Sequence, residues 1–335
     1  MNTRKSAPRT GAQLLLRWSL AAVLILALAV AGAIVANRTL YSASHEVKKL
    51  HQLLAAGKGG EALGLLHATV PKGDAVALDG EVLANSQKAI TDLVVDAPQA
   101  AGDDPERRTV TARYKANGVD KETSYELRRT GKSWLFFDRW EFVPHELPRV
   151  RIRANTVNEV TVNGQKIPLH RGVATLPVFY PSVIDSSFST TNFAADARGV
   201  AVTGPAEKAV PISLKTKPTK KFISSVSDKV KKYLDECTTQ QVLFPSGCPF
   251  SYDTQSRVDP DTIEWSIAKY PKIDVSYYNG YWVLSPLDFT AKLDLVEQDL
   301  RTGAKEEKSI SNEFSFTAKL TTSTTEVSVK PVASQ

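Results

Sequence analysis

The histidines and cysteines of this chain are the side chains with the strongest capacity to bind a metal. The five histidines are His45, His51, His67, His145 and His170. None of them pairs at the i, i+2 or i, i+4 spacing, and the first two, six positions apart, fall on different faces of a helix. The sequence therefore predicts no metal site and no cofactor.

The two cysteines, Cys237 and Cys248, are eleven positions apart. Without a neighbouring histidine they cannot supply the four ligands of a structural zinc site. In an oxidising compartment this spacing favours a single disulfide, and the alternative is two unpaired thiols.

Two further stretches have the composition of a catalytic or phosphate-binding site. The sequence AGKGGEAL at residues 56–63 lacks the spacing of a nucleotide-binding loop and follows a predicted helix, so it indicates a helix stop and a turn. Asp103 and Asp104 lie between Gly102 and Pro105, which favours a solvated turn over a general base. No Gly-x-Ser-x-Gly nucleophile elbow occurs. We therefore expect a protein that is not an enzyme.

Two aromatic-rich stretches, residues 134–142 and 277–282, fall on predicted strands. Side chains of a strand alternate between its two faces, so one face of each is expected in the core and the other is free to bind a partner. The candidate binding surface consists of Trp134, Phe137, Trp140, Tyr278 and Trp282.

Near its N-terminus the chain contains an uncharged apolar stretch at residues 18–36. A helix of that length, at about 1.5 Å per residue, crosses a hydrocarbon core of about 30 Å. We expect a transmembrane helix over residues 18–37 behind a basic tail at residues 1–17. The alternative is a cleaved signal peptide, because Ala27-Leu28-Ala29 and Ala31-Gly32-Ala33 have the form of a cleavage site.

The net charge of +6 is concentrated around this apolar stretch. Four basic residues precede it, one follows it, and no acidic residue occurs before Glu46; the five are Arg4, Lys5, Arg9, Arg17 and Arg38. The remaining body carries a net charge of only +1, which argues against a nucleic-acid partner. The positive-inside rule places the tail in the cytoplasm and the body outside a cell membrane crossed once.

Residues 42–148 have the pattern of a first α+β module. A helix is predicted over residues 42–57, capped by Ser44, followed by shorter helical patterns at 61–67 and 80–93. Alternating strands follow, with turns predicted at Asn117-Gly118 and at residues 130–132, and the last strand covers residues 133–143.

The rest of the chain predicts a small β-domain at residues 149–217 and a second α+β module at residues 218–332. In the β-domain, the Ser/Thr-rich residues 182–192 are expected to form a surface loop, and the alternative is a flexible recognition loop. The second module begins with a helix at residues 221–234, whose apolar stripe is Phe222, Val226, Val230 and Leu234. The fold class is therefore α+β, with an N-terminal transmembrane helix and two helix-plus-antiparallel-sheet modules flanking an all-β domain.

Residues 45–143, with EALGLL behind the first helix and a meander ending on SWLFFDRWEF, resemble the cone-shaped α+β roll of the nuclear-transport-factor and cystatin-like superfamily. With the anchor, the VTVNGQ hairpin and the second module, the chain resembles exported proteins of Gram-positive bacteria, distantly the teicoplanin-resistance-associated TcaA-like proteins. The C-x10-C-P-F stretch at residues 237–250 is similar to one in actinobacterial single-pass membrane-anchored proteins.

These patterns lead to two functional interpretations. The first is an extracytoplasmic cell-envelope protein that acts as a non-catalytic binding, scaffold or sensor module, with an envelope protein or a cell-wall component as its partner. The second is a cone-fold module that binds a small apolar ligand or catalyses acid/base chemistry on it. A desolvated acid inside a pocket would distinguish the second interpretation from the first.

Overall fold

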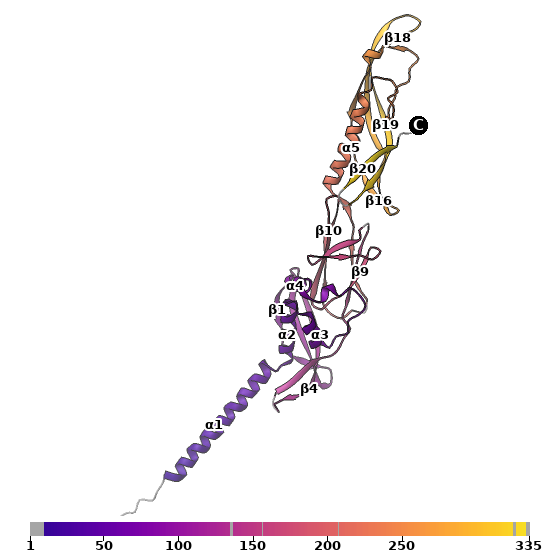
Figure 1. Cartoon of the computed structure of the whole chain (residues 1–335). Helices are drawn as coiled ribbons and strands as arrows, with labels where there is room; N and C mark the ends of the chain where they lie inside the picture. Colours follow the sequence, from indigo (N-terminus) through magenta and orange to yellow (C-terminus); the bar gives the residue numbers. More distant parts are fainter. Residues whose placement is uncertain (1–9, 135–136, 156, 207, 324–325, 333–335) are drawn as a thin grey trace, which may run out of the picture. The chain divides into compact units, whose positions relative to one another are not determined.

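The structure is a computed structural model that describes residues 10–134, 137–155, 157–206, 208–323 and 326–332 (Figure 1). Within these residues it is an α+β protein with five α-helices and several antiparallel sheets. The chain divides into two compact units, which are described separately here. Unit 1 comprises Met1–Arg153, Thr161–Ser186 and Arg198–Ser213, and unit 2 comprises Ala154–Val160, Ser187–Ala197 and Leu214–Gln335. The boundaries expected at residues 148 and 217 stay predictions.

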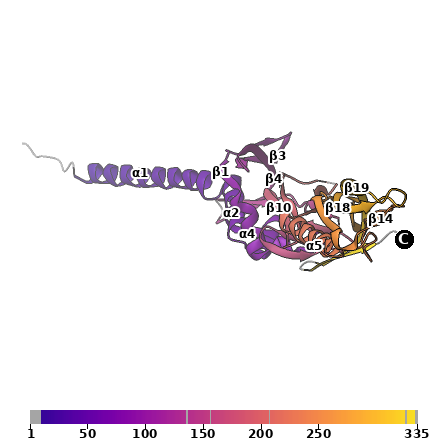
Figure 2. The ribbon, with the colours of Figure 1, turned by 90° about the horizontal axis from the view of Figure 1, so that it is seen from above.

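Unit 1 begins with helix α1 (Thr10–Thr39). Its segment Leu16–Asn37 is long and apolar enough to cross a membrane, and none of it is buried by the rest of the protein. Figure 2 shows α1 as one continuous helix. This confirms the expectation of an N-terminal apolar helix of membrane-spanning length.

The next helix, α2 (Ala43–Ala55), begins two residues earlier than an N-cap at Ser44 would allow. Ser42, not Ser44, is the N-cap, and its hydroxyl accepts a hydrogen bond from the amide of His45. Ser44 lies inside the helix, where its hydroxyl donates to the carbonyl oxygen of Asp96 at 2.6 Å. One face of α2 is apolar and lies in the core, because Val47, Leu50 and Leu54 are all fully buried.

Helices α3 (Gly59–Leu66) and α4 (Gly80–Lys88), with the 3₁₀ turn η1 (Ala75–Leu78) before α4, complete this layer. Gly59 starts α3 where the chain passes directly against Leu78: a Cβ at this position would lie 1.6 Å from the Leu78 carbonyl oxygen. Its amide donates to the Asp79 carboxylate at 2.8 Å. The prediction of a helix to residue 93 is wrong, because a strand starts at Ile90.

The antiparallel sheet of unit 1 contains β1 (Ile90–Val95), β2 (Gln99–Ala101), β3 (Asp104–Ala116), β4 (Val119–Ser133) and β5 (Phe137–Phe142). Its order is β1-β3-β4-β5, and β2 pairs with β3. Helix α2 packs against β1, β3 and β5, α3 against β5, and α4 against β1. The predicted alternation in β3 is confirmed, since Val110, Ala112, Tyr114 and Ala116 are buried.

The two predicted turns of this meander have different outcomes. Asn117 and Gly118 form a turn with φ of 50° and 77°, as expected. The turn predicted at residues 130–132 is wrong: β4 continues to Ser133, and Gly131 lies where the β4–β5 register shifts. A glycine inside a strand can mark such a bulge as well as a turn.

Residues 149–218 contribute two more sheets. One contains β6 (Arg149–Ala154), β9 (Val173–Pro177) and β12 (Val210–Leu214) in the order β12-β6-β9. The other contains β7 (Glu159–Val162), β8 (Gln165–Pro168), β10 (Ser182–Ser189), β11 (Phe193–Val202) and β13 (Lys217–Pro218) in the order β13-β11-β10-β7-β8. The surface loop expected at residues 182–192 is therefore mostly a strand, in which Val183, Ile184 and Phe188 are buried.

Unit 2 is built on helix α5 (Lys220–Thr238), which is capped by the Thr219 hydroxyl at the amide of Phe222. Its sheet contains β14 (Arg257–Val258), β15 (Glu264–Lys269), β18 (Leu287–Gln298), β19 (Lys305–Thr322) and β20 (Val327–Val332), and the 3₁₀ turn η2 (Pro260–Thr262) precedes β15. The order is β14-β18-β19-β20, with β15 paired to β18. A separate hairpin consists of β16 (Val275–Tyr278) and β17 (Tyr281–Leu284).

The core of unit 2 lies between α5 and this sheet. The predicted stripe of α5 is confirmed, since Phe222, Val226, Val230 and Leu234 are buried, and the helix packs against β15 and β20. Trp265 and Phe316 are buried in this unit, whereas Val275 is only half-buried.

The two cysteines lie at disulfide distance, in agreement with the expected pairing. Cys237, in the last turn of α5, is bonded to Cys248 with a Cα–Cα distance of 5.8 Å. The loop that they close also docks on the sheet, because the indole of Trp265 donates to the carbonyl oxygen of Val242 at 2.9 Å. The disulfide therefore connects the end of α5 to the loop that reaches β15.

Candidate functional site

The five aromatic residues predicted as a binding surface are divided between the two units: Trp134, Phe137 and Trp140 belong to unit 1, and Tyr278 and Trp282 to unit 2. In unit 1 they have different surroundings. Trp134 follows β4 with 86% of its surface exposed, whereas Phe137 stacks on Tyr41 with ring centres 4.2 Å apart. The three side chains therefore do not form one aromatic face.

Trp140 lies on β5 and is half-buried. The Arg108 guanidinium stands 5.9 Å from the centre of its ring, within cation–π range. Trp140 also lines an open hollow of about 460 Å³ beside α2 and α3, whose other walls carry Lys49, Glu61 and Arg139. This hollow is largely charged and exposed.

In unit 2, the β16–β17 hairpin has two chemically different faces. The pairs Tyr278↔Tyr281 and Tyr277↔Trp282 are directly opposite in its register, and adjacent pairs point to opposite faces. Trp282 stacks on Phe193 with ring centres 4.7 Å apart, so its face packs on the unit. The other face is open: Tyr278 is 66% exposed and Tyr281 75%.

This second face extends to Val283, which is 36% exposed, and to Ser276 opposite it. We call these four residues, Ser276, Tyr278, Tyr281 and Val283, the tyrosine face. Sequence reasoning chose Tyr278 correctly as an exposed side chain but omitted Tyr281 from the candidate surface. The register across the Asn279-Gly280 turn is the signal that places Tyr281 beside Tyr278.

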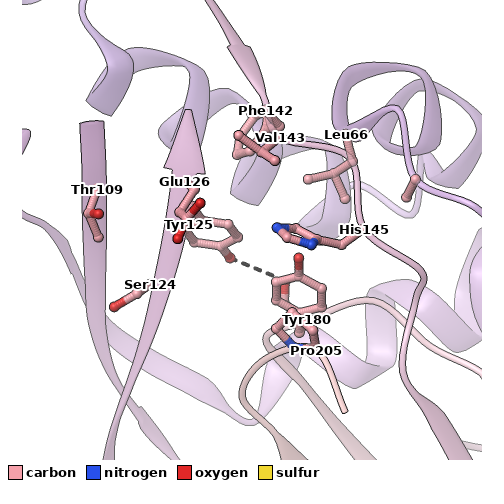
Figure 3. A pocket seen from close by; sticks show the side chains of 11 residues that line it. Leu66, Thr109, Ser124, Tyr125, Glu126, Phe142, Val143, His145, Tyr180 and Pro205 are labelled. Atoms are coloured by element: carbon pink, nitrogen blue, oxygen red, sulfur yellow. Dashed lines mark hydrogen bonds between the residues drawn. The ribbon is translucent and has the colours of Figure 1, made fainter. Parts of the chain in front are cut away.

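Unit 1 contains a partly enclosed cavity of about 210 Å³ under the sheet (Figure 3). Its apolar wall includes Leu66, Phe142, Val143 and Pro205, and its polar wall includes Tyr125, Tyr180 and His145. In Figure 3 the imidazole of His145 and the phenol of Tyr180 both point into the cavity.

The polar wall is organised by Tyr125, which points from β4 into the core. Its hydroxyl donates to the carbonyl oxygen of Tyr180 at 3.2 Å and lies 3.4 Å from Nε2 of His51 on α2. The rings of Tyr125 and Tyr180 are stacked, with centres 5.8 Å apart. A helix, a strand and the segment before β10 therefore meet at one phenol.

Burial keeps these groups neutral near neutral pH. It lowers the pKa of His51 to about 4 and raises the pKa of Tyr180 to about 12. Burial also raises the pKa of Tyr125 well above its usual value. The phenols of Tyr125 and Tyr180 thus offer neutral hydrogen-bonding groups beside an apolar wall, which suits binding of a small, largely apolar molecule.

The carboxylate on the cavity lining is Glu126. It is exposed, and its Oε2 lies 3.8 Å from a guanidinium nitrogen of Arg107. General acid catalysis near neutral pH usually requires a carboxyl group that burial keeps protonated. Glu126 does not have that environment.

Sequence reasoning did not find this cavity, because its members are far apart along the chain. No sequence pattern indicates that Tyr125, His51 and Tyr180 are neighbours. Among the residues that the structure describes, no group of three or more His, Cys, Asp or Glu side chains is placed to hold a metal ion.

Comparisons with known proteins give no match: no family model, no curated protein and no solved structure resembles this chain. The tyrosine face and the cavity are therefore interpreted from their own geometry.

Proposed function

We propose that this protein is a membrane-anchored extracytoplasmic component of the cell envelope that acts as a non-catalytic binding, scaffold or sensor module. The tyrosine face of unit 2 carries this proposal. It combines two largely exposed phenol rings with an aliphatic neighbour on one side of a hairpin whose other side already packs on the unit. Large exposed aromatic side chains of this kind mark interaction surfaces.

The proposed location is supported by α1 and by the disulfide. Four basic residues precede the uncharged stretch at residues 18–36 and one follows it, so the positive-inside rule favours a body outside the cytoplasm. A disulfide persists in an oxidising compartment, which agrees with this orientation. We also propose that the helix-plus-sheet modules are cone-shaped and cystatin-like. The chain would then be distantly related to the TcaA-like proteins and belong to a Gram-positive envelope.

The chemistry of the tyrosine face suits a partner with both apolar and polar groups. A phenol ring buries apolar area with few rotatable bonds, and its hydroxyl can donate or accept a hydrogen bond. An envelope protein or a cell-wall component can provide such a surface, and neither requires a charged groove like the one that nucleic acid would need.

Site-specific photo-cross-linking in intact cells tests this function. Benzoylphenylalanine is introduced in place of Tyr281, and the matched control carries it in place of Leu300, which is 73% exposed on the β18–β19 turn of the same unit. We expect an adduct with an envelope component at position 281 that weakens with Tyr278→Ser and is absent at position 300. Identical products at both positions would contradict the proposal.

The second candidate function is the binding of a small apolar ligand by the cavity of unit 1. The observation that favours it is the convergence of Tyr125, Tyr180 and His145 beside an apolar wall. Native mass spectrometry of the full chain in detergent tests it by the mass of a co-purified small molecule. Val143→Trp should fill the cavity and remove that mass, whereas Leu53→Trp, at a half-buried position outside the cavity, should retain it.

A further inference from the structure

The β4–β5 hairpin of unit 1 is attached directly to the end of the apolar segment of α1. Asn37 is the last residue of that segment. The amide of Asp138 donates to Oδ1 of Asn37 at 2.9 Å, and the Asn37 side-chain amide donates to Oδ2 of Asp138 at 3.4 Å. In Figure 1 the end of β4 lies beside the end of α1.

An aromatic stack strengthens this attachment one turn further along the chain. Tyr41 and Phe137 are nearly parallel, with ring centres 4.2 Å apart and 17° between their planes. Phe137 and Asp138 are the first two residues of β5, so the start of this strand is held at the level where α1 leaves the apolar segment. The position of the hairpin along α1 is thereby defined.

Trp134 stands at the end of this hairpin. It follows Ser133, which pairs with Phe137 across the two strands. Three residues of extended chain cover at most about 10 Å, so Trp134 lies within that reach of Phe137. The headgroup layer on each side of the hydrocarbon core is roughly 5–8 Å thick. With α1 in a bilayer, Trp134 is therefore within reach of that layer.

Within the part of the chain that the structure describes, packing does not account for a tryptophan at this position. The side chain is 86% exposed, and the backbone adopts φ of +52°, a left-handed conformation that bulky residues rarely occupy. Glycine or asparagine would fit that conformation with less strain. Strain at an exposed side chain points to a role outside the fold.

The neighbouring surface has matching chemistry. Leu40 is 59% exposed and Tyr41 38%, and they lie three and four residues beyond the end of the apolar segment at Asn37. Tryptophan and tyrosine are enriched at both membrane–water interfaces, where an apolar ring with a polar atom suits the headgroup level.

We propose that Trp134 inserts into the lipid headgroup layer on the body side of the membrane, so that unit 1 contacts the bilayer through both α1 and the β4–β5 hairpin. The partner is the phospholipid bilayer itself. The inference rests on the proposed function only in that α1 must remain in the membrane, and it adds a second contact that restricts the tilt of unit 1.

Fluorescence quenching by lipids spin-labelled near the headgroup tests this contact. The full chain is reconstituted in mixed phosphatidylcholine and phosphatidylglycerol vesicles, and the five tryptophans are compared through Trp→Phe variants. Trp18 lies at the other end of the apolar segment and reports insertion of α1 independently. Trp265 is buried in unit 2. The Trp265→Phe variant is therefore the control for the loss of emission from one tryptophan.

We expect Trp134→Phe and Trp18→Phe each to remove a separate part of the quenching, the double variant to remove nearly all of it, and Trp265→Phe to leave it unchanged. If Trp18→Phe alone removes all quenching, α1 is inserted and the proposed hairpin contact is wrong. If the wild-type protein shows no quenching, the anchor and the hairpin contact are both wrong.

A second variant separates lipid contact from folding. Trp134→Asn should abolish the same part of the quenching as Trp134→Phe, without lowering the thermal unfolding midpoint, because asparagine accepts positive φ. A lower midpoint together with unchanged quenching would show that Trp134 serves the fold and would overturn the proposal.

Discussion

Units 1 and 2 both place a hydroxyl-capped helix over an antiparallel sheet, but the two buried interfaces differ in chemistry. On α2 the buried stripe includes His51, which approaches the hydroxyl of Tyr125. On α5 the stripe is apolar from Phe222 to Leu234 and ends at the disulfide of Cys237. The same architecture thus encloses a polar cluster with a cavity in unit 1 and an apolar helix stripe in unit 2, where the buried carboxylate of Glu297 on β18 is paired with Lys308 on β19.

This difference indicates what each core can do. A buried polar cluster specifies a geometry and can offer hydrogen bonds to a guest, but each of its groups costs free energy if left unpaired. An apolar core with a disulfide is stabilised without that constraint and can support an exposed hairpin. The following predictions test this contrast.

The largest effect is expected from a charge in the core of unit 2. Val226 is fully buried on α5, so Val226→Asp should place an unpaired carboxylate there and destabilise unit 2 by about 3–5 kcal/mol. Ser224 is exposed on the same helix, so Ser224→Asp should have almost no effect. Denaturant unfolding measures both, and two unchanged midpoints would show that α5 does not pack through this stripe.

The second effect is the acid sensitivity that His51 adds to unit 1. Burial lowers the folded pKa of His51 from 6.5 to about 4. As the pH falls, His51 therefore binds a proton in the unfolded state before it does so in the folded state. The contribution of neutral His51 to the stability of unit 1 is complete above pH 6.5 and is lost as the pH falls from 6.5 to about 4. Its total should be at most about 3 kcal/mol. Unfolding measured against pH should show this slope in the wild type, and an unchanged slope in His51→Gln would contradict the assignment.

The third effect concerns the disulfide of unit 2. Closing a loop of this length lowers the conformational entropy of the unfolded chain, which stabilises the folded state by about 2–3 kcal/mol. Reduction should lower the stability of unit 2 by that amount and leave unit 1 unchanged, as followed by urea unfolding. The Cys237→Ser/Cys248→Ser variant is the control, because a reductant should not affect it. Equal losses in wild type and variant would rule out the disulfide as the cause.

The smallest effect tests the polar cluster of unit 1. Tyr125→Phe removes the hydroxyl that contacts His51 and the Tyr180 carbonyl oxygen, and should cost about 1–3 kcal/mol by leaving buried groups unpaired. Tyr278→Phe on the exposed tyrosine face should change stability very little. If the two variants have equal midpoints, the polar cluster does not contribute to the stability of unit 1.

The parts of the fold that were predicted correctly depend on local periodicity. The stripe of α5 and the inward residues of β3 follow from spacings of 3.6 and 2, which the sequence displays directly. The strand β10 was missed because Ser182 and Ser186 are buried there among apolar residues, so their polarity masks the alternation. Gly131 was taken for a turn because a bulge and a turn use the same residue type.

The cavity could not be predicted, for a different reason. His51, Tyr125 and Tyr180 come from three elements that meet only after the helices have packed on the sheet. The spacing of residues within a single helix or strand does not indicate which side chains of other elements will contact it. The tyrosine face, by contrast, could have been completed from sequence, because a two-residue turn fixes which tyrosines stand opposite each other.

The short connection between α1 and α2 limits where unit 1 can act. The apolar segment ends at Asn37 and α2 begins at Ala43, so very little chain separates the membrane from the folded body. A long flexible linker would let a binding module sample a large volume, which would lower the local concentration of the module at the membrane. With α1 in the bilayer, unit 1 instead samples a thin shell above the lipid. Any molecule that it captures must come to the membrane surface, where the local concentration of the module is high.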